Sequence, residues 1–218
     1  AYQVDSPFGA DVGGVSAAIS AVMAEAEFDS WLTVGMTDGS DTSAIATSPN
    51  LGLWDWTETA AFSTTDGAVF WMSPSDGPSG SGIVMAQLTL PNAAYASGGS
   101  ATALLQGSSV VGDDWQTAGV TWSYPAGSAP PPPPLPVQVG GLTASVAVVA
   151  TDGVAGYTTI RLLASLPDTA ANVYAMAGNG ATALSMPAAY QVGAPFGADV
   201  GGVDPALFAF SAEAEFDS

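Results

Sequence analysis

Carboxylates are the plentiful reactive side chains of this sequence, which has 20 acidic residues, one basic residue and neither His nor Cys. Asp113 and Asp114 are adjacent, and Glu25, Glu27 and Asp29 alternate along the chain. Two carboxylates beside aromatic side chains are what a glycoside-cleaving enzyme requires. Adjacent acids alone do not make a cleft, however, and the sequence offers few amide or cationic groups to hold sugar hydroxyls. We therefore predict that the protein is not an enzyme, with a glycoside-acting enzyme as the least favoured alternative.

Calcium is the metal that these side chains could bind, because it takes about six to eight oxygen ligands from carboxylates and carbonyls. The most calcium-like stretch is residues 37–41, Thr-Asp-Gly-Ser-Asp, although it lacks the complete acidic pattern of an EF-hand loop. An ordinary turn is the competing interpretation. The three alternating acids would share one face of an extended segment, as a solvated edge that resists strand pairing or as further calcium ligands. The candidate calcium ligands are Asp38, Asp41, Asp113 and Asp114.

The composition excludes several classes of function. Without His or Cys the chain cannot form a Ser-His-Asp triad, a thiol nucleophile, a zinc finger or an iron–sulfur site. With a single cation it lacks the Lys and Arg side chains that neutralise nucleic-acid phosphates. No stretch of about 18 apolar residues is present, so no membrane span is predicted. The single cation, Arg161, is expected to form a structural ion pair with a carboxylate.

An internal repeat is the strongest signal in the sequence. Residues 189–218 match residues 1–30 at 22 of 30 positions without gaps, at an offset of 188 residues. This pattern favours a polypeptide with a period of about 188 residues that continues beyond the second copy. The alternative is one domain that carries the same segment twice, for example as two equivalent docking sites. The residues expected to act in assembly are Tyr2, Val4, Phe8, Tyr190, Val192 and Phe196.

Short apolar runs separated by Gly, Pro, Asp and Ser predict an all-β fold, a β-sandwich of the jelly-roll or immunoglobulin-like kind with long loops and little helix. Most of the six Trp side chains are expected in its core rather than stacked on sugars. The predicted strands span residues 31–36, 53–57, 68–72, 83–90, 101–106, 120–124, 143–150, 157–166 and 172–177.

A proline-rich linker is predicted over residues 126–136, where five consecutive prolines should form an extended polyproline helix of about 3.1 Å per residue. It separates a β-sandwich portion, residues 1–125, from a second β portion, residues 137–218. Either residues 137–188 fold back onto residues 1–125, or the folding unit starts near residue 137 and continues into a next copy. The prolines are also candidate sites of O-linked or hydroxyproline-linked sugar, with a bare spacer as the alternative: Pro130, Pro131, Pro132, Pro133 and Pro134.

Four stretches carry a resemblance to known proteins: AYQV–PFGADVGG–AEFDSWLTVG, GAVFWMSPSDGPSG, VVGDDWQTAGVTWSYP and YTTIRLLASLPDTAANVYAM. They resemble large tandem-repeat surface proteins of algae and related aquatic eukaryotic microbes. The resemblance covers most of the chain outside the proline run. It implies a component of an extracellular fibril or flagellar hair, often glycosylated, and it implies no catalytic residues.

These observations predict a structural repeat unit of an extracellular fibril that assembles head-to-tail with further copies of itself. A surface charged almost entirely with one sign, with many Ser, Thr and Gly, predicts an extracellular or cell-surface location. A carbohydrate-binding or calcium-dependent adhesive surface module is the alternative. The expected partners are adjacent repeat units and covalent glycans, with no nucleic acid, no membrane span and no cofactor other than calcium.

Overall fold

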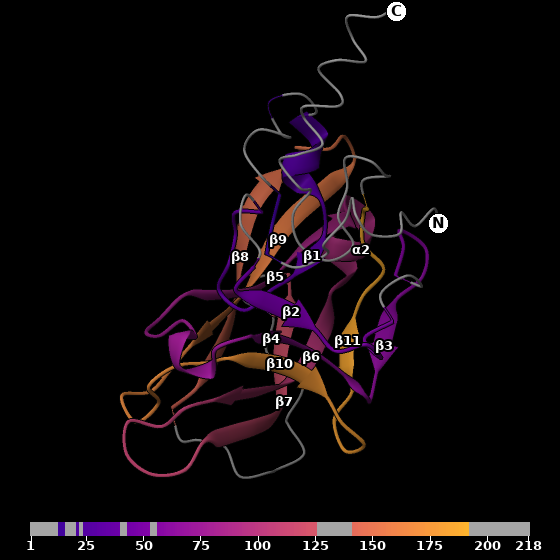
Figure 1. Ribbon diagram of the computed structural model, residues 1–218. Coiled ribbons are helices and arrows are strands. Elements are labelled where there is room, and N and C mark those ends of the chain that lie inside the picture. The colour runs from indigo at the N-terminus through magenta and orange to yellow at the C-terminus, as the bar shows by residue number, and fades with distance from the viewer. Residues whose placement is uncertain are drawn as a thin grey trace, which may run out of the picture.

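Two antiparallel β-sheets pack face to face in the structure of the protein, a computed structural model that describes residues 13–15, 21, 24–39, 43–52, 56–125 and 141–191. Figure 1 shows the two sheets crossing, with β8 and β9 of the four-stranded sheet drawn above β4, β10 and β7 of the seven-stranded sheet. The prediction of an all-β sandwich with little helix is confirmed. No helix of the described residues is both long and apolar enough to span a membrane.

The four-stranded sheet has the order β1-β5-β9-β8. Its strands are β1 (Trp31–Leu32), β5 (Ile83–Pro91), β9 (Tyr157–Ser165) and β8 (Thr143–Thr151). In β9 the fully buried residues Ile160, Leu162 and Ala164 alternate with partly exposed ones, as the period of two in a half-buried strand requires. β5 is buried along both faces, so it needs a cover on the side away from the core.

The seven-stranded sheet has the order β2-β4-β10-β6-β11-β3, and β7 pairs with the other edge of β6. Its strands are β2 (Ile45–Thr47), β3 (Phe62–Thr64), β4 (Gly67–Trp71), β6 (Gly99–Gly107), β7 (Trp115–Tyr124), β10 (Ala175–Gly178) and β11 (Leu184–Met186). The sequence did not predict β2, β3 and β11. Three residues are too few to display an alternation, so these strands depend on the neighbours with which they pair.

Short helical segments with both ends among the described residues are η1 (Ala24–Phe28), η3 (Pro74–Asp76) and α2 (Asn92–Ser97). α2 was not predicted, although Pro91 precedes it and Gly98 follows it with a positive φ of 79°. These two residues limit the helix to six residues.

Strands from both sides of residues 126–140 belong to the same sheets. β9, which follows the proline run, pairs with β5 over eight residues, and β10 pairs with both β4 and β6. Residues 141–191 therefore fold back onto the residues before the proline run. The prolines at 130–134 themselves lie outside the described residues.

Tryptophan side chains connect segments that are distant in the sequence. Trp31, Trp56, Trp115 and Trp122 are buried, as expected for core residues, whereas Trp54 lies outside the described residues. Four indole N–H groups each donate to main-chain carbonyls, which satisfies a polar group that would be costly to bury alone. The acceptors are Pro187 for Trp56 (2.7 Å), Val34 for Trp71 (2.7 Å), Ser108 and Asn172 for Trp115 (3.1 Å each) and Leu163 for Trp122 (2.8 Å).

The bond from Trp122 to Leu163 joins β7 of one sheet to β9 of the other, which leads to a prediction about stability. Trp122→Phe removes the donor and leaves a carbonyl in the core without this partner. We expect the free energy of unfolding to fall by about 1–3 kcal/mol, measured by urea denaturation. Val111→Ala, at a side chain that is 89% exposed, is the control and should change it by less than about 0.5 kcal/mol. Equal midpoints for the two variants would contradict this role of the indole.

Candidate functional site

A buried group of polar side chains lies on the outer face of the four-stranded sheet. We call Gln87, Thr89, Thr159 and Arg161 the polar patch. Gln87 lies opposite Arg161, and Thr89 opposite Thr159, on the paired strands β5 and β9. Gln87, Thr89 and Thr159 are at most 1% exposed. Such burial is unfavourable for polar groups unless each finds a hydrogen-bond partner, so the partners of the patch reveal what covers it.

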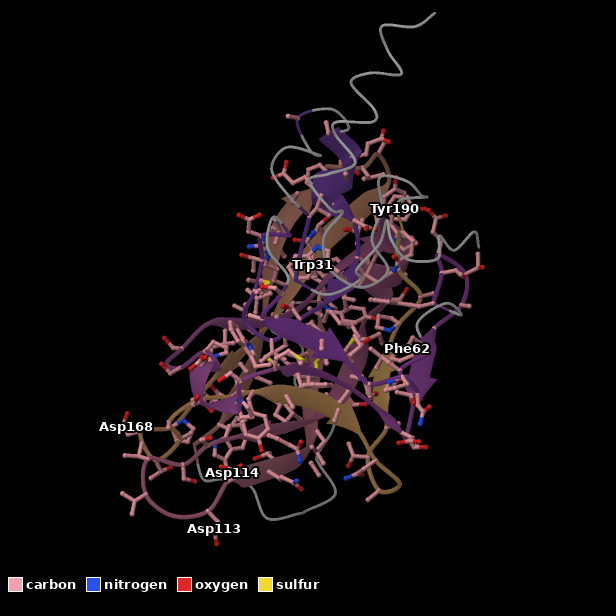
Figure 2. The ribbon with its side chains drawn as sticks, in the orientation of Figure 1. Trp31, Phe62, Asp113, Asp114, Asp168 and Tyr190 are labelled. Carbon is pink, nitrogen blue, oxygen red and sulfur yellow. The ribbon has the colours of Figure 1, made fainter. Side chains whose placement is uncertain are left out.

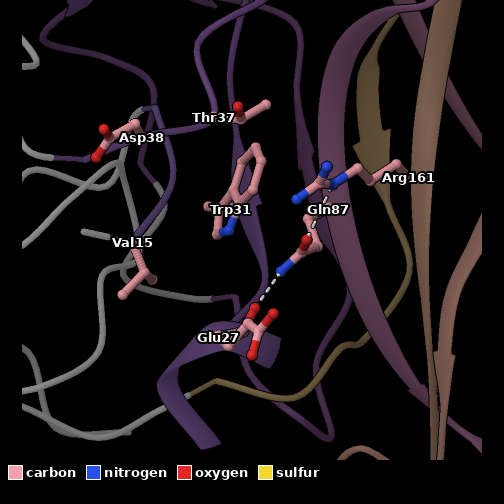
Figure 3. Close-up of a pocket in the computed structure, with 7 residues that line it drawn as sticks. All are labelled: Val15, Glu27, Trp31, Thr37, Asp38, Gln87 and Arg161. Carbon is pink, nitrogen blue, oxygen red and sulfur yellow. Dashed lines mark hydrogen bonds between the residues drawn. The ribbon is translucent and has the colours of Figure 1, made fainter. Parts of the chain in front are cut away.

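Gln87 is the centre of the polar patch. Its Oε1 accepts a hydrogen bond from Nε of Arg161 at 3.2 Å. Its Nε2 donates to the main-chain oxygens of Glu27 at 2.8 Å and of Asp29 at 2.9 Å. Figure 3 shows the Gln87 side chain between the guanidinium and the segment that carries Glu27. The amide thus fixes this segment against β5 through main-chain atoms, independently of side-chain identity at these two residues.

Thr89 contacts residues of both copies of the repeated segment. Its N–H donates to Oγ of Ser30 at 3.0 Å, and its hydroxyl donates to the carbonyl oxygen of Phe28. Its own carbonyl accepts the N–H of Tyr190 at 2.6 Å. Ser30 belongs to the first copy of the repeated segment and Tyr190 is the second residue of the next copy. Residues of the two copies therefore meet at a single residue of β5.

The segment 24–30 has a defined local structure of its own. The predicted extended edge is wrong here, because residues 24–28 form the 3-10 helix η1. In this conformation Ala26 is fully buried, whereas Glu25 and Glu27 are exposed. The N–H of Asp29 donates to the carbonyl of Ala26 at 3.2 Å, which closes the turn. The helical turn keeps the two glutamates in water and presents carbonyl groups to the polar patch.

A pocket of about 290 Å³ opens beside the patch and contains the single cation of the chain. The Arg161 guanidinium carbon lies 5.9 Å from the centre of the Trp31 ring, within range of a cation–π contact. Glu27 and Asp38 contribute the carboxylates of this pocket. The ion pair expected for Arg161 stays a prediction. The lining residues are Val15, Glu27, Trp31, Thr37, Asp38, Gln87 and Arg161.

The candidate calcium ligands are not brought together. Asp38 lies at the pocket near Trp31, whereas Asp113 and Asp114 lie in the loop before β7 at the far end of the molecule (Figure 2). Oδ2 of Asp114 accepts a hydrogen bond from the Tyr174 hydroxyl at 3.0 Å. Asp41 lies outside the described residues. Across the described part of the chain no three Asp, Glu, Cys or His residues are grouped so as to hold a metal ion, and calcium binding stays a prediction.

Tyr190 is the one expected assembly residue within the described residues. Its ring lies 5.2 Å from that of Tyr157 at an angle of 60°. Burial raises the pKa of Tyr190, and the nearby carboxylates of Glu25, Asp29 and Glu58 raise it further. The pKa of Tyr157 is raised by burial and by Glu58. The other five expected residues lie outside the described part of the chain: Tyr2, Val4, Phe8, Val192 and Phe196.

The sequence reasoning missed Gln87 and Thr89. The signal was present, because both interrupt the apolar run of residues 83–90 two positions apart and so share one face of a strand. The sequence does not reveal which segment covers this face, because the covering residues 24–30 lie about 60 positions away.

Comparison of the chain with models of protein families, with curated proteins and with solved structures gave no match. The description of the site consequently depends on the contacts of this chain alone.

The raised tyrosine pKa values predict a loss of stability in alkali. A tyrosine whose pKa in the folded state exceeds its unfolded value of about 10 is protonated in both states at lower pH, so there it adds no pH dependence to the free energy of unfolding. The free energy of unfolding should therefore be unaffected by these groups below about pH 10 and should fall as the pH rises above it. In the double variant Tyr157→Phe, Tyr190→Phe the fall should be shallower, measured as the melting temperature from pH 8 to 12. An identical decline in both proteins would contradict the assignment.

Proposed function

We propose that the chain is a structural repeat unit of an extracellular filament. Each period of about 188 residues folds as one β-sandwich, and the repeated segment joins consecutive sandwiches head-to-tail. The single observation that carries this proposal is the meeting of Ser30 and Tyr190 at Thr89. The stretch between the two copies, residues 31–188, thus begins and ends beside the same strand of one sandwich, which suits a chain of equal units.

The pattern of identity between the two copies supports the same proposal. The described residues of the first copy are 13–15, 21 and 24–30, and all eleven are identical in the second copy. The eight differences fall at positions 5, 6, 16, 17, 19, 20, 22 and 23. Among the described residues, the second copy thus retains each one with which the first copy contacts its sandwich, as a unit that begins a further sandwich would require.

Strand β8 offers a surface for contact between filaments. It pairs with β9 and with no other strand among the described residues, so it forms an edge of the four-stranded sheet. Its nine residues include no charged side chain, in a chain of net charge −19. Val148 and Val149 on this strand are 48% and 43% exposed. Uncharged edge strands with exposed apolar side chains recruit further strands, and a neutral edge lets acidic copies approach with the least repulsion.

The proposal includes location and modification. The acidic, cation-poor composition suits an extracellular or cell-surface protein, and the resemblance to tandem-repeat surface proteins of algae supports that location. We propose O-linked or hydroxyproline-linked sugar on the prolines at 130–134, because an extended proline run keeps each ring accessible to modifying enzymes.

A second candidate function, a glycan-binding or calcium-dependent adhesive module, draws support from the pocket beside the patch. Arg161 and Asp38 supply a cation and a carboxylate, groups of the kind that bind sugar hydroxyls. Against it, Trp31 is only 2% exposed and cannot offer its ring face to a sugar. Titration of the chain with calcium chloride and with neutral oligosaccharides tests this function, which requires saturable one-to-one binding.

Electron microscopy of the native material that contains this chain tests the filament directly. We expect filaments of uniform width, with density beyond the polypeptide where sugars are attached. Discrete particles of single-sandwich size would overturn the proposed function, whatever their stability.

A charge on the edge strand should separate the filaments. Val149→Glu places a carboxylate on β8, and in an acidic protein this adds repulsion at the proposed contact. We expect fewer bundled filaments in micrographs and an unchanged melting temperature. Val111→Glu, which adds the same charge at an exposed loop position, is the matched control and should bundle as the unaltered protein does. Equal bundling by both variants would exclude β8 from the contact.

A further inference from the structure

We propose that β8 pairs with β8 of a second copy of this chain, antiparallel and about a two-fold axis at Ala147, so that two four-stranded sheets join into one sheet of eight strands. The inference deepens the proposed contact between filaments, and it rests on the proposed function only in treating the paired copies as units of filaments. It adds the partner of the edge strand, the direction of the pairing and its register. The pairing itself is measured on separate chains.

β8 is an open edge of the four-stranded sheet. It pairs with β9 on one side, and no strand of the described residues pairs with its other side. None of its nine residues is buried, whereas seven of the nine residues of β5 are. Figure 1 shows β8 as the outermost strand beside β9. An edge strand directs main-chain N–H and C=O groups away from its sheet, where a further strand can pair with them.

The sequence of β8 reads almost the same in both directions. Residues 143–151 are Thr-Ala-Ser-Val-Ala-Val-Val-Ala-Thr, and reversal changes only positions 145 and 149. When two identical strands pair antiparallel about a common centre, each residue lies opposite its mirror position. In a β8 pair identical residue types therefore meet everywhere except at these two positions, with Ala147 opposite its own copy. Thr opposite Thr is a favourable cross-strand pair, and a two-fold contact needs such a surface that fits itself.

The valines of β8 give this pairing its apolar content. Val146 and Val148 face the core side of the sheet, because they lie opposite the fully buried Leu162 and Ile160. Val148 is nevertheless 48% exposed at the open edge. In the proposed pair Val146 of one copy lies opposite Val148 of the other, so the contact covers the exposed valine of both copies. β7 is likewise an edge among the described residues, but its large apolar side chains are all buried and offer no such surface.

The strand is regular where the axis is placed. The pairing of β8 with β9 is regular from Thr143 to Val148, and its register shifts by one residue at Val149. The central pairs of the proposed contact, Ala147 with its own copy and Val146 with Val148, lie within the regular part. Position 149 is also one of the two at which the sequence is not symmetrical. The regular contact is therefore short and centred on Ala147.

The charges around β8 allow two acidic copies to approach. β8 itself has no charged side chain, and its central residue Ala147 lies opposite Arg161, the single cation of the chain. The nearest acid along the chain is Asp152, five residues from the axis. In the antiparallel pair its two copies would lie about 34 Å apart, at about 3.4 Å per residue. Salt screens charges beyond about 10 Å, so local repulsion at this contact is small.

The contact of two single chains should be weak. One pair of strands is small beside a standard protein interface of about 1,600 Å², and the net charge of −19 on each copy opposes association at long range. We therefore expect a dimer that dissociates on dilution and that is favoured by salt. Two filaments side by side would form many such pairs at once, and many weak contacts together bind far more tightly than one.

Sedimentation of the separate 218-residue chain tests the pairing. We expect a monomer–dimer equilibrium in which the dimer fraction rises with protein concentration and with sodium chloride. Val149→Glu, next to the central residues, should abolish the dimer, whereas Val111→Glu, with the same charge on an exposed loop, should retain it. A chain that stays monomeric at every concentration and salt would overturn the proposal.

Single cysteines test the register, because the unaltered chain has none. Residues directly opposite in an antiparallel pair have Cα atoms about 4.5–5.5 Å apart, within the range of about 4.4–6.8 Å that a disulfide spans. Ala147→Cys should therefore form a disulfide-linked dimer under mild oxidation. Ser145→Cys is the matched control on the same face of β8, since its two copies would lie four residues apart, or about 14 Å. It should remain largely monomeric after the same treatment.

The outcomes separate this inference from the proposed function. Equal cross-linking of the two cysteine variants would overturn the register, and dimers that cross-link at neither position would place the contact outside β8. Both results overturn the inference. Filaments in micrographs together with monomeric separate chains would overturn this inference alone. Dimers of separate chains without filaments in the native material would overturn the proposed function alone.

Discussion

The carboxamide of Gln87 is held between a guanidinium on one side and two main-chain carbonyls on the other. The outer face of the four-stranded sheet depends on these three hydrogen bonds, because they allow a polar patch to be buried under the segment 24–30. A chain with one cation and no Cys can form few ion pairs between its parts and no disulfides. Neutral donors that reach distant carbonyls replace them. The tryptophan indoles in the core and the Gln87 amide on the outer face both donate hydrogen bonds to main-chain carbonyls of other segments. In both places the side chain that carries the donor also fills volume.

This arrangement places residues of both copies of the repeated segment on the same strand. Seven of the nine residues of β5 are buried, which limits how far this strand can move in the sandwich. Under the proposed function, attachment of both copies to β5 would give each sandwich one fixed point of connection. In the sequence the proline run comes between β7 and β8. These two strands belong to different sheets of one sandwich, so the run does not separate two independently folded parts.

Electrostatics set the limits within which such units can associate. Twenty carboxylates against one guanidinium make every approach of two copies repulsive at long range, although salt screens this repulsion beyond about 10 Å. Under the proposed function, contact between copies is favoured where charge is missing, as along β8. The exposed Glu25 and Glu27 illustrate the same rule, since their charges stay in water while their segment binds through carbonyls.

The sequence by itself determined the fold class, the period of the repeat and the longer strands. The runs at 83–90, 143–150 and 157–166 are long enough to be recognised as strands, and they became β5, β8 and β9. Composition alone excluded the chemistry of His, Cys and Lys. Tertiary structure decided the short strands β2, β3 and β11, which form because a neighbour offers a ladder of hydrogen bonds. It also decided the polar patch, because Gln87 and Thr89 acquire their role only when a segment some 60 residues away supplies carbonyls. Local pattern fixes what a residue prefers, but a buried polar group depends on partners that only the folded chain brings to it.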